Sequence, residues 1–242
     1  MSKDSLIGAP LQCIFCNETG PFTSEEHIVP HSLGNDLVVL APGWVCDPCN
    51  NVFSAFESRA LNSSILGVER CRLGVITKKR KPARATLHGM AWFAEPSKQR
   101  NTVSVEADWQ ALPTLWTGSE KEAVICPVHD SSNTDIARLL LKMGMEFLAV
   151  RDAHLHLKPA RRAAAGAVLG ISTSSWPYFL LSSKNCASRL TSVFCSTPNA
   201  HDHVRACGFD LYLHEIDGEE ILFFEYGELF FGVSITSSST NW

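Results

Sequence analysis

One stretch near the N-terminus decides the fold of this chain. Residues 13–51 read CIFCNETGPFTSEEHIVPHSLGNDLVVLAPGWVCDPCNN. A Cys-x-x-Cys pair stands at each end of the stretch, Cys13/Cys16 and Cys46/Cys49. Two pairs of thiolates, each on a tight turn, can close a tetrahedron around one zinc ion. The four cysteines therefore predict a zinc site, and the long segment between the pairs must fold into a structure of its own.

The segment between the cysteine pairs contains Glu26, His27 and Ile28 in succession, and Asn50 directly follows the last cysteine. A lone histidine is usually an ordinary surface or core residue. A Glu-His pair flanked by two zinc knuckles and followed by Cys-Asn is a joint pattern that chance rarely supplies.

This joint pattern resembles that of the HNH endonucleases, whose site is called the ββα-metal or His-Me finger. The nearest match is the subgroup in which two knuckles staple the finger together, as in phage resolvases of the endonuclease VII kind. The resemblance covers the N-terminal quarter of the chain. It rests on Cys13-x-x-Cys16, Glu26-His27-Ile28-Val29-Pro30, Ser32-Leu33-Gly34 and Cys46-x-x-Cys49-Asn50.

Hydrolysis of a phosphodiester needs an activated water, a cation on the phosphate and stabilisation of the leaving oxygen. A neutral imidazole with a pKa near ~6.5 can take a proton from water at physiological pH, so His27 is the expected general base. Glu26 and Asn50 offer oxygen ligands that suit a hard ion such as Mg²⁺. The resemblance implies that they hold this catalytic ion, while the zinc is structural.

The chain departs from the family pattern at two places. Asn50 stands where the last histidine of the family name is usually found. The middle asparagine usually lies shortly before the second knuckle, and here Asn35 is the candidate for it, eleven residues before Cys46. Whether Asn35 serves the site is left open at this point.

Composition places limits on class and compartment. The chain has 242 residues, of which 45% are hydrophobic and 19% charged, so it can bury a core. Five further cysteines (Cys71, Cys126, Cys186, Cys195 and Cys207) have no paired spacing and suggest buried or free thiols of a reducing cytosol rather than a disulfide framework. The N-terminus lacks an apolar run of signal-peptide length, and no stretch approaches a membrane span. We expect a soluble, cytoplasmic protein.

The predicted fold class is α+β, with an HNH finger at 1–68 and a second α+β region of unassigned type at 69–242. Within the finger, strands at 25–30 and 37–40 precede a helix that starts at Asn50. Helices are expected over 131–152, with a capping box formed by Ser132 and Asp135, and over 158–169. Hairpin strands are expected within 85–116. Further strands are expected at 176–181, 192–195, 209–213, 221–226 and 229–235, with a turn at Asp217-Gly218.

The most basic segment of the chain follows the finger and contains Lys78, Lys79, Arg80 and Lys81. A net charge of -4 argues against coating by nucleic acid, but a local basic patch can still contact the phosphate backbone. A solvated loop, or a strand edge protected by lysines, explains the segment equally well. Arg161 and Arg162 are better explained as solvated surface than as DNA contacts.

The leading hypothesis is a metal-dependent endonuclease that hydrolyses phosphodiester bonds of DNA, using zinc for structure and Mg²⁺ or another divalent ion for catalysis. A homodimer would suit double-strand cleavage, because one finger cuts one strand. The alternative is a non-catalytic zinc module that binds nucleic acid or protein. A thiol redox protein is disfavoured, because the βαβ context that it needs around a Cys-x-x-Cys pair is absent.

Overall fold

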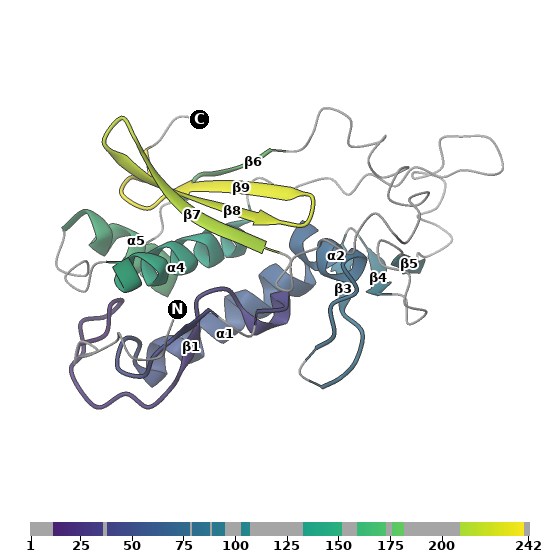
Figure 1. The fold of residues 1–242 in the computed structure, drawn as a ribbon, viewed down its shortest axis with the longest axis horizontal. Helices are drawn as coiled ribbons and strands as arrows, with labels where there is room; N and C mark the ends of the chain where they lie inside the picture. Colours follow the sequence, from purple (N-terminus) through teal and green to yellow (C-terminus); the bar gives the residue numbers. More distant parts are fainter. Residues whose placement is uncertain are drawn as a thin grey trace.

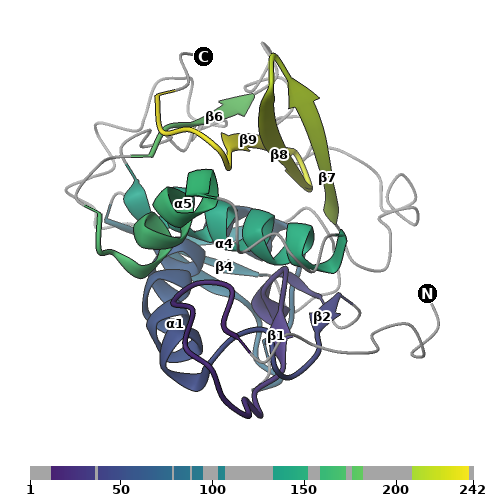
Figure 2. The ribbon, with the colours of Figure 1, turned by 90° about the vertical axis from the view of Figure 1, so that its left-hand side faces the viewer.

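The chain folds into three layers in a computed structural model (Figure 1). The structure describes residues 12–35, 38–77, 79–87, 89–94, 103–106, 133–151, 159–172, 176–181 and 209–239. A four-stranded sheet forms one layer, helices α4 and α5 form the middle layer, and helix α1 with the N-terminal strands forms the third (Figure 2). The mixture of helices and separate antiparallel sheets confirms the α+β class.

The N-terminal layer has the predicted strand, strand, helix order. Strands β1 (Glu26–His27) and β2 (Val39–Leu40) are antiparallel, and His27 pairs with Val39. A 3-10 turn, η1 (His31–Leu33), follows β1, and helix α1 (Asp47–Asn62) follows β2. Helix α1 begins three residues before the predicted Asn50. Cys46 adopts an extended N-cap conformation and Pro48 lies in the first turn, where its missing N–H costs no hydrogen bond.

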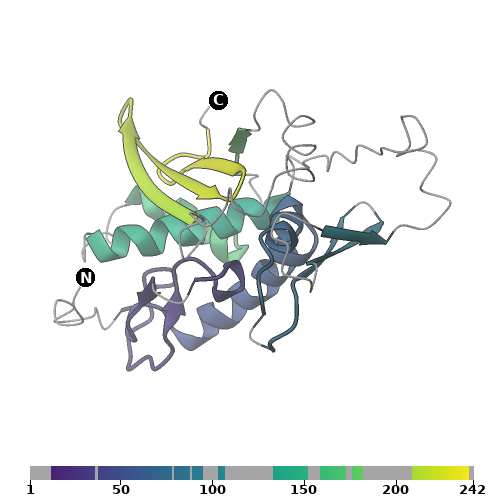
Figure 3. The same cartoon turned by 45° about the vertical axis from the view of Figure 1, so that its right-hand side comes forward.

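A smaller sheet lies beyond the end of α1. Helix α2 (Ile65–Arg72) packs on strands β3 (Arg84–Leu87) and β4 (Met90–Ala94), and β5 (Val103–Glu106) completes an antiparallel sheet of order β3-β4-β5. The strands confirm the hairpin expected after residue 85. A second hydrophobic cluster, which includes Val68, Cys71 and Trp92, fills the space between α2 and the sheet. Figure 3 shows this unit beside the main layers.

The C-terminal layer is a sheet packed on a long helix. Helices α4 (Thr134–Arg151) and α5 (Pro159–Leu169) lie within the predicted ranges. Strands β6 (Tyr178–Leu181), β7 (Phe209–Ile216), β8 (Glu219–Tyr226) and β9 (Leu229–Ser234) form an antiparallel sheet of order β6-β9-β8-β7. The predicted Asp217-Gly218 turn joins β7 to β8, and both residues have positive φ.

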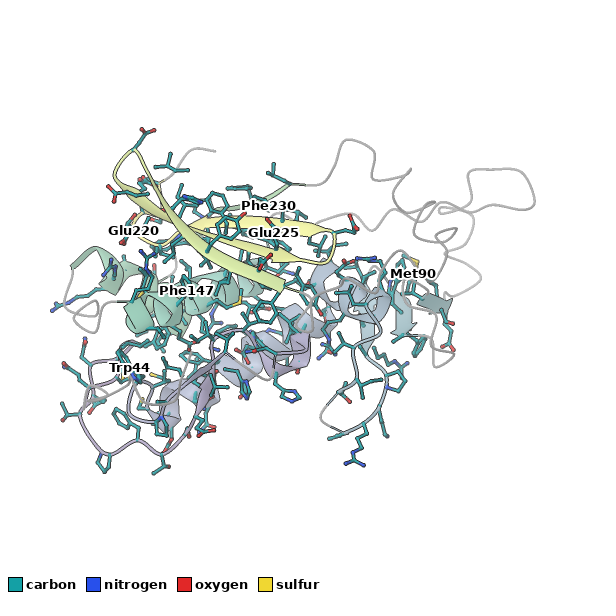
Figure 4. All side chains as sticks on the ribbon, viewed as in Figure 1. Trp44, Met90, Phe147, Glu220, Glu225 and Phe230 are labelled. Atoms are coloured by element: carbon teal, nitrogen blue, oxygen red, sulfur yellow. The ribbon has the colours of Figure 1, made fainter. Side chains whose placement is uncertain are left out.

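Close approach of α4 to this sheet depends on Gly144. A Cβ atom at this position would lie 2.6 Å from the side chain of Ile235, which is closer than real Cβ contacts allow. Side chains on β8 point alternately into the core and away from it. Leu222, Phe224 and Tyr226 are fully buried in the core, whereas Phe223 and Glu225 are only partly buried, and the Phe223 ring lies against Phe230 of β9. Figure 4 labels Glu225 and Phe230 on this sheet.

One sequence prediction in this region is wrong, and another falls partly outside the described residues. The predicted capping box involves Ser132, which lies outside them; within them, Asn133 Oδ1 accepts hydrogen bonds from the backbone of Asp135 and Ile136 at the start of α4. Arg161 is not solvated surface: it is buried and pairs with Glu220 of β8. Arg162 is exposed, as predicted.

The N-terminal and C-terminal layers share one hydrophobic core. It joins Phe53 and Phe56 of α1 to Leu139 and Leu140 of α4 and to Phe231 of β9. The division at residue 68 stays a prediction. The strand expected at 192–195 and the cysteines at 126, 186, 195 and 207 lie outside the described residues, while Cys71 is buried and free, as predicted. None of the described helices is long and apolar enough to span a membrane, and the cytoplasmic location stays a prediction.

Candidate functional site

The four predicted zinc ligands come together. The Sγ atoms of Cys13, Cys16, Cys46 and Cys49 all lie within 4.8 Å of one another. Four sulfurs that each lie about 2.3 Å from a tetrahedral zinc are separated by about 3.8 Å, so the cluster fits this ion. The first pair lies on a tight turn closed by Asn17, which has a φ of 63° and donates its N–H to Cys13 O. The second pair begins α1.

Short backbone contacts hold the two knuckles against each other. Ile14 N donates to the carbonyl of Trp44 at 3.0 Å, and the Trp44 side chain is buried in the finger (Figure 4). Cys46 N donates to Cys13 Sγ at 3.4 Å. A hydrogen bond from Cys49 lowers the pKa of the Cys13 thiol to about 4, and burial raises that of Cys16 to about 11. The thiolate is the form of cysteine that binds a metal.

Asn35 closes the loop between β1 and β2. Its side chain is fully buried, its Nδ2 donates to Val29 O at 2.6 Å and to Val38 O at 2.9 Å, and its Oδ1 accepts from Val38 N at 2.8 Å. These bonds join the chain just after β1 to the chain just before β2. Asn35 therefore holds the hairpin that carries Glu26 and His27, and it does so through backbone groups.

Glu26 and His27 occupy opposite faces of β1, as alternation along a strand predicts. His27 is half-buried, and its ring meets the ring of His31 edge to face with centroids 5.6 Å apart. Glu26 is only 6% exposed and its carboxylate turns into the core. Burial raises the pKa of Glu26 above its usual value, although the nearby Lys142 ammonium opposes the shift.

The side chain that meets Glu26 in the core is Lys142 of α4. Its Nζ lies 2.6 Å from Glu26 Oε1 and donates a second hydrogen bond to the carbonyl of His27 at 2.8 Å. Glu57 of α1 and Glu146 of α4 also pair with it, at 3.0 and 3.2 Å. Lys142 is fully buried, and these carboxylates raise its pKa against the desolvation that lowers it. The ammonium therefore stays charged.

Asn50 is half-buried in the first turn of α1, directly after Cys49 of the cysteine cluster. Within the described part of the chain, the Glu26 carboxylate pairs with Lys142, and no hydrogen bond joins Glu26 to Asn50. A carboxylate still offers acceptor sites on both oxygens. A carboxylate and an amide oxygen are donor types that suit a hard divalent cation by chemistry.

The basic segment forms a tight turn between α2 and β3. Thr77 N donates to Lys81 O at 2.9 Å and Arg80 N donates to Thr77 O at 2.8 Å. Lys79, Arg80 and Lys81 are exposed, whereas Lys78 lies outside the described residues. The arginines just before the turn behave differently: Arg70 and Arg72 are buried, the first bonded to Leu61 O and the second paired with Glu69.

Sequence reasoning missed Lys142, Glu57 and Glu146. Lys142 and Glu146 fall on the apolar stripe of α4, at the spacing of Leu139 and Met143, where the pattern predicts only core. A Lys and a Glu four residues apart within a buried stripe are the available signal, because fully buried charges are rare unless paired. Glu57, on α1, shows no comparable pattern.

The comparisons with known proteins agree with the N-terminal geometry. Residues 13–66 match the family model of the HNH endonucleases. This range contains all four clustered cysteines, β1, β2 and α1. No curated protein and no solved structure matches the chain.

Proposed function

Because residues 13–66 form an HNH endonuclease domain, we propose that the protein is a metal-dependent endonuclease that hydrolyses phosphodiester bonds of DNA. The observation that carries the proposal is the finger itself. Strand β1, which carries His27, lies in a hairpin between the two cysteine pairs of the Cys₄ cluster. The second of these pairs lies at the start of helix α1, which carries Asn50. Each proposed site residue is thus positioned by a short, rigid element.

In the proposed reaction, His27 accepts a proton from the attacking water as the water oxygen bonds to phosphorus. The phosphorus–oxygen ester bond on the opposite side breaks, and the leaving oxygen takes up a proton from solvent water to become a hydroxyl. A divalent ion, when bound by Glu26 and Asn50, supplies charge stabilisation at the phosphate and the leaving oxygen. The products are a phosphate end and a hydroxyl end.

The zinc site has a structural role in this proposal. Its four protein ligands leave no position for water or substrate, as in other closed zinc sites. By joining Cys13 and Cys16 to Cys46 and Cys49, the site ties the N-terminal turn to the start of α1. Asn50, the next residue after Cys49, is then placed at the start of α1 by the second knuckle.

Lys79, Arg80 and Lys81 are the proposed DNA contacts, together with Lys78. Exposed lysines and arginines on a tight turn suit the phosphate backbone, which supplies affinity independent of sequence. A homodimer would allow both strands of a duplex to be cut.

The buried Glu26–Lys142 pair favours one alternative. A carboxylate fully committed to an ammonium would leave no metal site, and the protein would then be a non-catalytic zinc module that binds nucleic acid or protein.

Incubation of supercoiled plasmid with the purified protein tests the two functions. Conversion to open-circle or linear plasmid that needs Mg²⁺ or Mn²⁺, stops with EDTA and is absent from an identically purified His27→Ala sample supports the nuclease. Unchanged plasmid at every metal concentration, from protein that retains zinc and shifts the plasmid in a gel, supports the binding module.

A further inference from the structure

One buried ammonium contacts both proposed functional residues of β1. Lys142 Nζ binds Glu26 through the side chain and His27 through the backbone carbonyl, at 2.6 and 2.8 Å. The strand itself is only two residues long, and its ladder to β2 joins two residue pairs. Lys142 therefore supplies a second anchor for a strand that has few backbone hydrogen bonds of its own.

The anchor comes from a different part of the chain. Glu26 and Lys142 lie 116 positions apart, and α4 lies far beyond residues 13–66, which match the family model. The same ammonium also pairs with Glu57 of α1 at 3.0 Å and lies 5.6 Å from the centre of the Phe53 ring. Lys142 thus joins three elements: β1, α1 and α4.

Complete burial makes the position of this group well defined. Lys142 has no exposed surface, and a buried ammonium must keep its partners because their loss leaves an uncompensated charge. Charge-assisted hydrogen bonds at these distances are among the strong ones in proteins. A shift of α4 relative to the finger would consequently move Glu26 and His27.

We propose that Lys142 is a positioning residue of the nuclease site, through which α4 sets the orientation of Glu26 and the place of His27. The inference rests on the proposed function, because it assigns Lys142 a role in that same site. In this proposal the finger contains the reacting groups. Helix α4, which lies beyond the finger in the sequence, keeps Glu26 and His27 in position.

The test replaces Lys142 with the apolar methionine in a background that carries an uncharged amide at position 146, so that no ionisable group at that position is left beside the methionine. We compare Lys142→Met/Glu146→Gln with Glu146→Gln alone. Misplacement by about 1 Å can cost up to ~100-fold in rate. We expect kcat to fall at least about tenfold while KM for plasmid and zinc content stay unchanged. Lys142→Arg keeps a charged donor with different geometry, so its kcat should lie between those of Lys142→Met/Glu146→Gln and the wild type.

Glu57→Gln is the matched control, because it removes a partner of Lys142 without touching β1. A core role without positioning predicts similar kcat for the lysine variants and Glu57→Gln, and that result would overturn the proposal. If the methionine variant fails to fold, the kcat of Lys142→Arg is compared with that of Glu57→Gln. A kcat that falls only in Lys142→Arg supports the positioning role, and equal kcat values in the two variants overturn the proposal.

Hydrogen exchange of the zinc-loaded proteins, without added Mg²⁺ or Mn²⁺, gives a readout independent of cleavage. Peptides that cover β1 should exchange faster in the lysine variants than in Glu57→Gln, while peptides from the zinc knuckles keep wild-type protection. Equal exchange of β1 in all variants would overturn the inference. A wild type that never cleaves plasmid would instead remove the proposed function, and the exchange experiment would still report whether Lys142 holds the strand.

Discussion

His27 and Glu26 are neighbours in sequence but have different surroundings. The half-buried His27 ring packs against His31, while the Glu26 carboxylate lies in the core. A strand separates consecutive side chains onto two faces, so the two residues have different neighbours. This separation explains how a single short strand can carry both a half-buried imidazole and a buried carboxylate.

The first prediction concerns His27, the proposed proton acceptor. His27→Ala should lower plasmid cleavage by a factor of about 100 to 10,000, the usual contribution of a general base. Zinc content and melting temperature should stay at wild-type values, because the Lys142 contact with residue 27 is to the backbone carbonyl. Rates are measured from the loss of supercoiled plasmid.

His31→Ala is the matched control for this variant. It removes the neighbouring ring, 5.6 Å away, but no atom that the mechanism uses. A His27→Ala protein that cleaves as fast as the wild type would exclude His27 as the base.

Asn35 supports the second prediction. Its amide makes three hydrogen bonds to the backbone of Val29 and Val38. Asn35→Ala leaves these buried groups without their partner, at about 1–3 kcal/mol for an unsatisfied group. We expect the free energy of unfolding, measured by urea titration, to fall by at least that amount. Asn62→Ala, on the exposed end of α1, is the control and should change it little. Equal stability of both variants would contradict the role of Asn35.

At the scale of elements, the two knuckles connect a loop to a helix. The loop before β1 has little regular structure, so its position depends on Cys13 and Cys16. Helix α1 begins at its own ligand pair. The zinc site is therefore expected to stabilise the finger as a whole rather than one element.

The third prediction follows from this connection. Cys46→Ser should abolish zinc binding and unfold the finger, because structural zinc contributes on the order of 10 kcal/mol to folding. The measurements are zinc content and the melting curve. Cys71→Ala is the control: Cys71 is buried in the second hydrophobic cluster, so this change lowers stability but leaves the zinc content unchanged. An unchanged melting curve for Cys46→Ser would mean that no structural zinc is present.

Helix α4 contains a buried carboxyl whose protonation affects stability. Burial raises the pKa of Glu146 well above its usual value, against the lowering effect of Lys142. The folded state therefore binds a proton that the unfolded state releases above its ordinary pKa. Stability from this group is full below that ordinary value and declines as pH rises towards the folded value.

Glu146→Gln replaces the protonated acid with an amide of the same shape and removes this pH dependence. We expect the variant to match the wild type near pH 4.5 and to be more stable than the wild type at pH 8, as measured by urea titration at each pH. Glu57→Gln, a partner of the same lysine, is the control. A variant that is less stable than the wild type at pH 8 would show that Glu146 is ionised in the folded protein.

At the scale of the whole molecule, the finger shares its core with a layer formed by the second half of the chain. Arg59 of α1 pairs with Asp135 of α4 by two bonds of 2.8 Å, and Arg138 of α4 lies 4.4 Å from the ring of Phe56. Figure 2 shows α4 between the sheet and the finger. The finger and the C-terminal layer are consequently expected to unfold together.

The fifth prediction concerns the surface. Lys79→Ser/Lys81→Ser should weaken plasmid binding and reduce the slope of log K against log salt by about 1 for each phosphate that the protein no longer neutralises. Arg151→Ser/Arg162→Ser removes two exposed charges from other helices and is the control. If both variants and the wild type show the same slope, the basic turn does not contact DNA and is solvated surface.

Short-range spacing in the sequence is sufficient to predict the zinc cluster, the strand, strand, helix order and the long helix α4. These features depend on residues close together along the chain, whose geometry follows from turns and from the strand and helix periods. The ionic partner of Glu26, the backbone role of Asn35 and the burial of Arg161 became known only from the tertiary structure. Each depends on which distant groups the core brings together. For Glu26 the partner is 116 positions away, on a helix whose apolar spacing conceals a lysine that the packing buries and pairs.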